Sequence, residues 1–142
     1  MKKLSPTANS TLWEINVQKA TNSDFVQFGI ALDPADHVFI GGMFTGTVDF
    51  GGAPMTSDRA GGSTFNVDML LAHLAPYGRR VWSASPSMAG TLGHQRVFDI
   101  TRHPAGGSVI IGDFAGSLTL GGTTCVNTDG KNEDPFVVRY VP

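Results

Sequence analysis

Hydrophobic residues along this chain are grouped in short runs that have the patterns of β-strands. Residues 37–44 and 69–74 are apolar at nearly every position, which predicts strands covered on both faces. Residues 11–17 and 26–32 alternate between apolar and polar or small side chains, which predicts strands with one apolar face. In the second of these, the side chains expected to share the apolar face are Val26, Phe28, Ile30 and Leu32.

Turn residues separate these runs. Pro34 and Pro104 each occupy the second position of a four-residue turn, where the fixed φ of proline favours a type I turn. Longer connections are predicted at residues 20–25, 51–67, 86–95 and 121–133. Because neighbouring strands are antiparallel, we expect these four connections at one end of the fold and the tight turns at the other. A binding site, if the chain has one, is expected at the end with the long connections.

The chain contains one unit twice. Residues 28–52 align with residues 98–122 at an offset of 70, with 10 identities in 25 positions. Residues 68–76 align with residues 134–142 at an offset of 66, and Leu12-Trp13 align with Val81-Trp82 at an offset of 69. Each unit therefore reads as four antiparallel strands, of which the middle ones are covered on both faces.

This repeat predicts an all-β chain made of two four-stranded antiparallel β-propeller blades, a partial propeller. The alternative is an eight-stranded β-sandwich. We expect residues 1–10 to be disordered and residues 11–84 to form an outer strand plus the first blade. Residues 85–142 are expected to form the second blade, which the N-terminal strand can complete as its outer strand. Since propellers close with about 4 to 8 blades, the expected partners are further blades or copies of the chain itself.

Residues 33–52, with the sequence DPADHVFIGGMFTGTVDFGG, resemble the bacterial seven-bladed β-propeller (SBBP) repeat family. In that family a stretch of the form D-P-x-G-N-V-Y-V-T-G-x-F-x-G-T-V-D-F-G precedes a loop and a D-x-F-V-A-K-L strand, which is similar to residues 68–74 and 134–140. The chain departs from the family at the Gly-Asn of the first turn in both copies, and at Met69 and Pro135. The resemblance covers nearly the whole chain from Leu12. It implies a non-catalytic binding or display scaffold of a secreted or cell-surface bacterial protein.

Composition and charge exclude several function classes. The chain has 142 residues, 18 of them glycine, and a net charge of -2, and its ten lysines and arginines are spread along its length, so we expect no nucleic-acid partner. Its apolar runs are far shorter than the roughly 20 residues that cross a membrane, and no signal peptide is expected in this chain. Cys125 is the only cysteine and is expected to be a small buried hydrophobe.

Three residues form the candidate ligand-binding site. His94, Gln95 and Arg96 lead into a predicted strand near the expected axis, where they would contact an anionic ligand. The acidic residues within 127–134 lack calcium-loop spacing and the four histidines lack zinc-site spacing, so neither a metal nor another cofactor is expected. No serine stands in a G-x-S-x-G motif, and no catalytic residue is assigned.

Two functions are compatible with this pattern. The first is the non-catalytic scaffold, with a protein or carbohydrate as its ligand. The alternative is part of a propeller enzyme, a lyase or hydrolase, whose site lies at the end with the long connections. An enzyme of this kind would place titratable residues at equivalent positions of successive strands, whereas here Gly29 aligns with Asp99 and Asp33 with His103.

Overall fold

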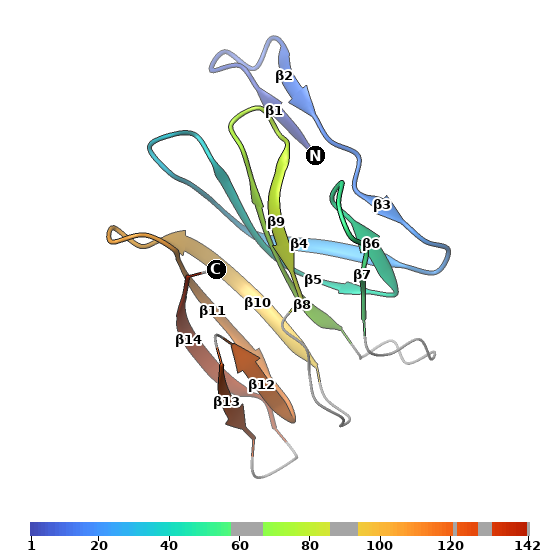
Figure 1. The fold of residues 1–142 in the computed structure, drawn as a ribbon, viewed down its shortest axis with the longest axis vertical. Coiled ribbons are helices and arrows are strands. Elements are labelled where there is room, and N and C mark those ends of the chain that lie inside the picture. Colours follow the sequence, from blue (N-terminus) through green and yellow to red (C-terminus); the bar gives the residue numbers. More distant parts are fainter. Residues whose placement is uncertain (58–66, 86–93, 121, 128–131, 142) are drawn as a thin grey trace.

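The computed structural model describes residues 1–57, 67–85, 94–120, 122–127 and 132–141 (Figure 1). The regular elements in these residues are all strands: β1 (Lys2–Leu4), β2 (Thr11–Glu14), β3 (Gln18–Lys19), β4 (Asp24–Leu32), β5 (Val38–Thr45), β6 (Thr47–Asp49), β7 (Met55–Thr56), β8 (Asp68–Leu74), β9 (Arg80–Ala84), β10 (Gln95–Arg102), β11 (Ser108–Phe114), β12 (Ser117–Leu120), β13 (Thr123–Val126) and β14 (Asp134–Tyr140). The all-β prediction is confirmed. Within the described ranges there is no helix long and apolar enough to span a membrane.

The first sheet has the four antiparallel strands expected of one unit, in the order β4-β5-β8-β9. Its two middle strands are buried on both faces, as their apolar pattern predicted. The tight turns at residues 33–37 and 75–79 lie at one end of the sheet, because Leu32 pairs with Val38 and Leu74 pairs with Arg80. The longer connections leave from the opposite end of the sheet.

The second sheet contains three strands, in the order β10-β11-β14. We expected both middle strands of this unit to be covered on both faces in an assembly with further blades, and in this chain by itself one face is exposed. Val137 in β14 is 71% exposed and Ile111 in β11 is 45% exposed. One face of the second sheet is therefore open, because no layer of the described residues covers it.

Two short hairpins, β6–β7 and β12–β13, lie in segments that were predicted mainly as connections. Val48 of the first hairpin and Leu118 of the second are buried at equivalent positions of the two copies. The alternation of Val48 and Phe50 with polar residues was the available sequence signal. The connection that begins at residue 51 was expected to stay at the end of the sheet with the long connections. Instead, the turn of the first hairpin reaches back along the sheet, where a side chain at Gly52 would meet the Arg80 guanidinium.

A β-bulge in β4 overturns the prediction that Val26, Phe28, Ile30 and Leu32 share one face. The register shifts between Gln27 and Gly29, so Phe28 is the extra residue. Val26 consequently pairs with Met43, whereas Ile30 pairs with Ile40, and these two partners lie on opposite faces of β5. The second sheet has the same shift, between Val97 and Asp99 of β10.

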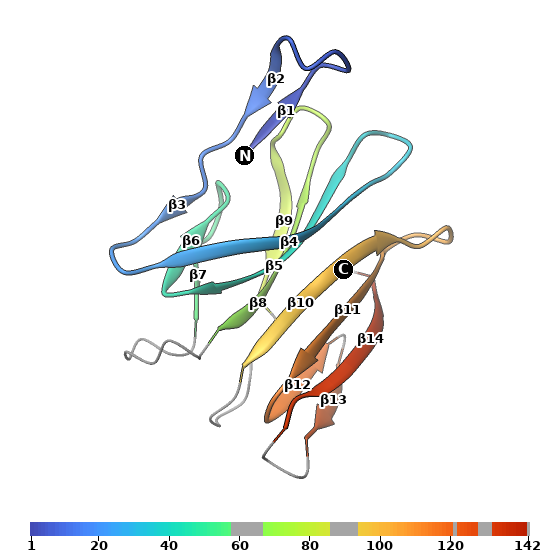
Figure 2. The same ribbon diagram turned by 180° about the vertical axis from the view of Figure 1, so that it is seen from behind.

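The two sheets pack through opposite faces. We call the face that carries Phe39 in the first sheet and Val109 in the second the front face, and the face that carries Ile40 or Ile110 the back face. The front face of the first sheet packs against the back face of the second, with β10 beside β4 and β5 (Figures 1 and 2). Their shared core consists of Phe39, Met69 and Leu71 from the first sheet, Val97, Ile100, Ile110 and Phe114 from the second, and Leu118 and Leu120 of the β12–β13 hairpin.

Glycines allow the two sheets to approach closely. A Cβ atom at Gly29 would lie 2.6 Å from the backbone nitrogen of Ile100, and one at Gly41 would lie 2.6 Å from Cγ1 of Val97. Real Cβ atoms do not make contacts this short. Both positions face the neighbouring sheet, so the packing distance between the sheets depends on the absence of these two side chains.

The N-terminal segment 1–10 was expected to be disordered, but it contains β1, which pairs with β2. This hairpin repeats the β8–β9 hairpin: Lys3 pairs with Trp13 as His73 pairs with Trp82. The turns share a backbone hydrogen-bond pattern, with Ala8 and Gly78 donating to the residue three positions earlier at 2.8 and 2.9 Å. Both of these residues have positive φ. The segment is therefore ordered because it forms the same kind of hairpin as β8–β9.

The N-terminal hairpin also packs as its counterpart does. Met1 and Trp13 lie against the core on the back face of the first sheet, and their counterparts Leu71 and Trp82 contribute to the core on the back face of the second. Trp13 Nε1 donates a hydrogen bond of 2.7 Å to the carbonyl oxygen of Pro76. Since β2 pairs with β1, it does not complete the second sheet in this structure.

Candidate functional site

The structure places the three predicted site residues on two different sides of the second sheet. His94 and Arg96 flank Gln95 at the start of β10, at the end of the sheet from which the longer connections leave. Successive residues of a strand point to opposite faces. Gln95 pairs with Phe114 on the back face and Arg96 pairs with Asp113 on the open front face, so the three side chains do not converge on one ligand.

Gln95 is part of the core between the two sheets. Its side chain is fully buried, and its Nε2 donates a hydrogen bond of 3.0 Å to the carbonyl oxygen of Ser117. Its backbone nitrogen donates to the carbonyl oxygen of Val67, also at 3.0 Å, which ties β10 to the residue that precedes β8. These contacts give Gln95 a structural role in joining the sheets and leave it inaccessible to a ligand from solvent.

Arg96 is held by two carboxylates on the front face. Its Nε and Nη2 atoms donate to the two oxygens of Asp113 at 2.8 and 2.5 Å, and Nη2 is 3.0 Å from Oε1 of Glu133. The hydrogen bonds to Asp113 raise the pKa of the Arg96 guanidinium, and the charges of Asp113 and Glu133 raise this pKa further, whereas partial burial opposes the change. An anionic ligand would have to displace both carboxylates to reach the guanidinium.

His94 completes this group, which we call the front-face ion cluster: His94, Arg96, Asp113 and Glu133. Nε2 of His94 is 2.9 Å from Oε1 of Glu133, an ion pair when the histidine is protonated, although the contact lacks hydrogen-bonding geometry. Asp113 was not among the predicted site residues, because its role depends on the strand register that sets it opposite Arg96. In the first copy the positions of Arg96, Asp113 and Glu133 are occupied by Val26, Met43 and Val67.

Replacing Arg96 with methionine should lower the free energy of unfolding by about 1–3 kcal/mol, because it leaves the nearly buried Asp113 carboxylate without the guanidinium. The triple variant Arg96→Val, Asp113→Met and Glu133→Val, which restores the residues of the first copy, should recover to within about 1 kcal/mol of the parent. Urea unfolding measures both values. A single variant as stable as the parent would show that the cluster is a solvated surface pair with no structural role.

The described residues contain no group of three or more His, Cys, Asp or Glu side chains arranged to hold a metal ion. The acidic stretch considered for calcium has residues 128–131 outside the described residues. In its described part, Glu133 belongs to the front-face ion cluster and Asn127 Nδ2 donates a hydrogen bond of 2.6 Å to the carbonyl oxygen of Asn132. These described residues are engaged in contacts with one another and with the ion cluster.

A second group of ionisable residues lies at the opposite end of the first sheet, around His73 in β8. The imidazole of His73 stacks on Phe39 with ring centroids 4.3 Å apart and contacts Trp82 at 5.7 Å. His37, which pairs with Asp33 at 2.9 Å, lies 5.1 Å from the His73 ring. Burial lowers the pKa of His73, the charge of His37 lowers it further, and Asp33 opposes this effect.

The lowered pKa of His73 predicts a loss of stability in mild acid. The unfolded chain binds a proton at His73 near pH 6.5, whereas the folded chain binds it only at lower pH, so the free energy of unfolding falls as the pH drops below about 6.5. Thermal unfolding between pH 7.5 and 5.5 should show this decline. The His73→Phe variant keeps the aromatic stack and should show a shallower decline, because it removes the group whose lowered pKa produces the loss of stability. An unchanged slope would exclude His73 as its source.

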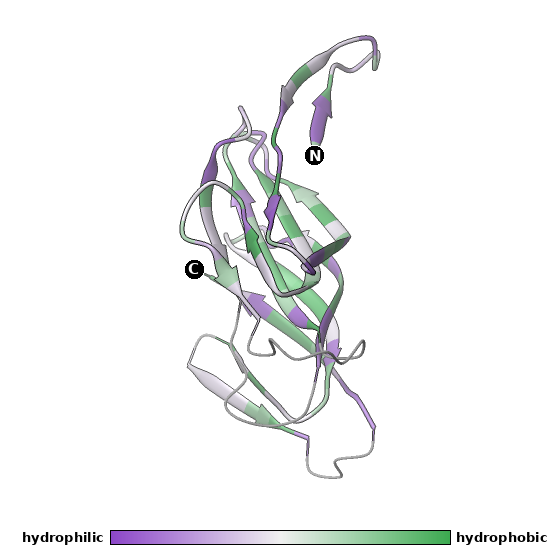
Figure 3. Ribbon diagram, turned by 90° about the vertical axis from the view of Figure 1, so that its right-hand side faces the viewer, coloured by the Kyte–Doolittle hydropathy of each residue, from purple (hydrophilic) through white to green (hydrophobic). Residues whose placement is uncertain are grey.

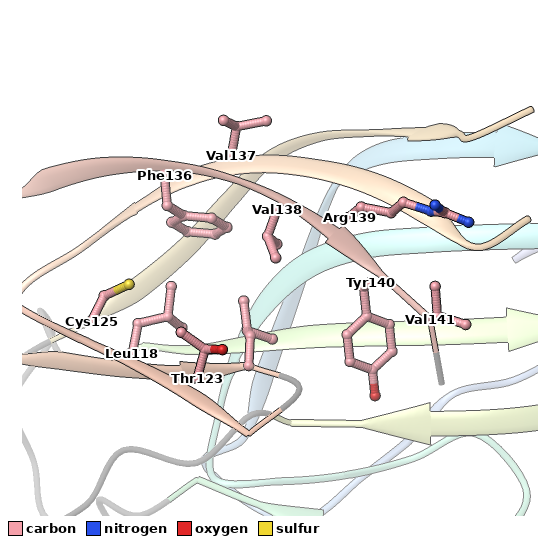
Figure 4. Close-up of a pocket in the computed structure, with 10 residues that line it drawn as sticks. Leu118, Thr123, Cys125, Phe136, Val137, Val138, Arg139, Tyr140 and Val141 are labelled. Carbon is pink, nitrogen blue, oxygen red and sulfur yellow. The ribbon is translucent and has the colours of Figure 1, made fainter. Parts of the chain in front are cut away.

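A cavity of about 420 Å³ lies between β14 and the β12–β13 hairpin (Figure 4). Phe136, Val138 and Tyr140 line it from β14, and Leu118 and Cys125 line it from the hairpin. Cys125 is exposed and borders this cavity, so the prediction that it is buried is wrong. In the first copy Ile15 and Val17, which precede β3, pack against the core on the same face, and the counterpart of Val17 in the second copy lies outside the described residues. We therefore assign no ligand to the cavity.

Comparison with known proteins found no family model, no curated protein and no solved structure that matches the chain. The resemblance to SBBP repeats therefore rests on the residues quoted in the sequence analysis. What the structure adds is the fold class, the register of each sheet and the way in which the two units pack.

Proposed function

We propose that this chain is a non-catalytic β-propeller repeat module that serves as a binding or display scaffold in a secreted or cell-surface bacterial protein. The location outside the cell is implied by the family resemblance alone. The proposed partners are further repeats of the same kind and, at the end with the longer connections, a protein or carbohydrate ligand.

The observation that carries this proposal is the front-to-back packing of the two units. A sandwich made from a duplicated unit would be expected to bury equivalent faces of its two sheets. Here Leu71 on the front face of the first sheet is buried, whereas Val137 at the same position of the second sheet is exposed. Stacking the front of one unit on the back of the next is the heterologous arrangement of propeller blades and other repeat arrays.

The ionisable groups favour a scaffold over a propeller enzyme. In the front-face ion cluster the guanidinium and both carboxylates are engaged with one another. The ion pair of His37 with Asp33 lies at the end that carries the tight turns. Both arrangements stabilise strand ends and turns, which is the role that a scaffold requires of them.

Insertion of a short epitope peptide tests the display function. An insertion between Gly61 and Gly62, within the connection from Ser57 to Val67, should change the melting temperature by less than about 2 °C and leave the epitope accessible to its antibody on the folded protein. This connection leaves the first sheet at the end proposed for display.

The matched control is the same insertion between Ala35 and Asp36. There the Asp33 Oδ1 atom accepts hydrogen bonds from the backbone nitrogens of Ala35 and His37, at 2.8 and 2.9 Å, so the insertion should lower the melting temperature by about 5 °C or more. Equal destabilisation at both sites would contradict a scaffold that carries its ligand-binding connections at one end.

A further inference from the structure

We propose that the two outer faces of this pair of sheets differ in what they accept. The back face of the first sheet accepts the front face of a further repeat that carries glycine at the positions of Gly29 and Gly41, and β1 and β2 are the outer corner of that repeat. The front face of the second sheet does not accept a further repeat in this geometry. The inference rests on the proposed repeat scaffold: it defines the partner of one outer face and makes the other outer face the end of the stack of repeats.

Gly29 is the position that decides whether two units can stack. Its missing Cβ atom would lie 2.6 Å from the backbone nitrogen of Ile100 and 2.9 Å from Cα of Asp99. Backbone atoms in a paired strand cannot move aside as the end of a flexible side chain can. A front face with any larger residue at this position therefore cannot reach the observed packing distance.

The front face of the second sheet lacks both glycines. Asp99 occupies the position of Gly29, directly after the same bulge, and Ile111 occupies the position of Gly41. A unit stacked here as the second sheet stacks on the first would bring its own backbone against the Cβ atom of Asp99.

Charge adds to this steric barrier. Three members of the front-face ion cluster, Arg96, Asp113 and Glu133, replace apolar residues of the first copy. A stacked unit would remove their charged groups from water, and their mutual attraction would have to offset this desolvation. Terminal units of repeat arrays characteristically carry such a polar outer face. The exposed front face of the second sheet has this character, although apolar side chains such as Val137 also lie on it.

The back face of the first sheet has the opposite character. Ile30 is 53% exposed there, whereas Ile100 at the same position of the second sheet is 4% exposed, because the first sheet packs over it. Leu32 is exposed beside Ile30. Two strands of the missing layer are already present as β1 and β2, and their residues Met1 and Trp13 contact this face as Leu71 and Trp82 contact the next. The occupant that continues these contacts is the rest of the same repeat.

Adding one repeat at either end of the full chain tests the proposal. The N-terminal extension joins residues 1–74 to residues 5–142, because Leu74 is the counterpart of Leu4 in the two hairpins. It presents Gly29 and Gly41 of the added unit to the back face of the original first sheet. Its melting temperature should rise by about 5–10 °C above that of the parent, with a single unfolding transition.

The C-terminal extension joins residues 1–140 to residues 75–142, because Tyr140 is the counterpart of Leu74. It sets Asp99, Ile111 and the front-face ion cluster against the added unit, and its melting temperature should not exceed that of the parent. We expect the rise in melting temperature to appear once the inner copy of this face carries the first-copy residues. The substitutions are Asp99→Gly, Ile111→Gly, Arg96→Val, Asp113→Met and Glu133→Val. The unextended chain with the same five substitutions is the control for their intrinsic effect.

The outcomes separate this inference from the function on which it rests. An unconverted C-terminal extension that is stabilised as much as the N-terminal one would overturn the inference and leave the repeat scaffold intact. A failure of the N-terminal and the converted C-terminal extensions to gain stability would contradict the repeat scaffold itself. Stabilisation of only these two chains is the predicted result.

Discussion

Replacing Gly29 with alanine should lower the free energy of unfolding by about 2–3 kcal/mol. The added methyl group would lie 2.6 Å from the backbone nitrogen of Ile100, so the sheets must separate or β4 must shift. Separation of the sheets would loosen a core that contains Val97 and Ile100, both almost fully buried. Urea unfolding followed by tryptophan fluorescence measures the change, because Trp82 packs beside this core.

The matched control is Asp99→Ala, at the same strand position of the second sheet. It adds no atom to the contact between the sheets, so it should cost no more than about 1 kcal/mol, from loss of the 2.8 Å hydrogen bond that Asp99 Oδ1 accepts from the Ile100 backbone nitrogen beside Gly29. If Gly29→Ala were no more destabilising than Asp99→Ala, the close approach of the two sheets would be wrong.

Truncation of Leu71 to alanine should be the most damaging of the proposed substitutions, at about 3–4 kcal/mol. Leu71 is fully buried between the sheets and forms part of their shared core. The alanine variant loses the transfer free energy of the removed atoms and leaves a cavity that rigid strands on both sides cannot fill. Chemical unfolding of the parent and the variant under the same conditions gives the difference directly.

The repeat supplies the control for this truncation. Val137 occupies the position of Leu71 in the second sheet but is 71% exposed, so Val137→Ala should change stability by no more than about 0.5 kcal/mol. Comparable losses at the two positions would mean that the front face of the second sheet is covered in solution, which contradicts the exposed polar face described above.

The strands of the first sheet could be predicted from sequence because their signals are local. Val38 to Leu74 contains two long apolar runs bounded by turn residues, and a strand covered on both faces needs such runs. The N-terminal hairpin has no such signal: β1 is hydrophilic (Figure 3), and its turn sets Ala8, not glycine, at positive φ. Its order comes from packing against the first sheet through Trp13, which a search for apolar runs cannot detect.

Which face of the second sheet is open could not be predicted, because an apolar pattern shows which surfaces can be buried and not what buries them. Val137 and Leu71 have nearly the same pattern around them, yet only Leu71 has a neighbouring sheet. The candidate site failed for a related reason. Gln95 and Arg96 are adjacent in sequence but point to opposite faces, and Asp113 becomes the partner of Arg96 only through the register of β10 and β11.

The packing of the first front face on the second back face is the central claim, and nuclear Overhauser effects measure it directly. In the intact chain we predict cross-peaks between the α-protons of Gly29 and the amide proton of Ile100, and between the α-protons of Gly41 and the methyl groups of Val97. Cross-peaks between Gly29 and Gly41, which pair within the first sheet, serve as the internal reference. If the reference cross-peaks between Gly29 and Gly41 are present but both cross-peaks between the sheets are absent, the units do not stack. That result would contradict the proposed packing.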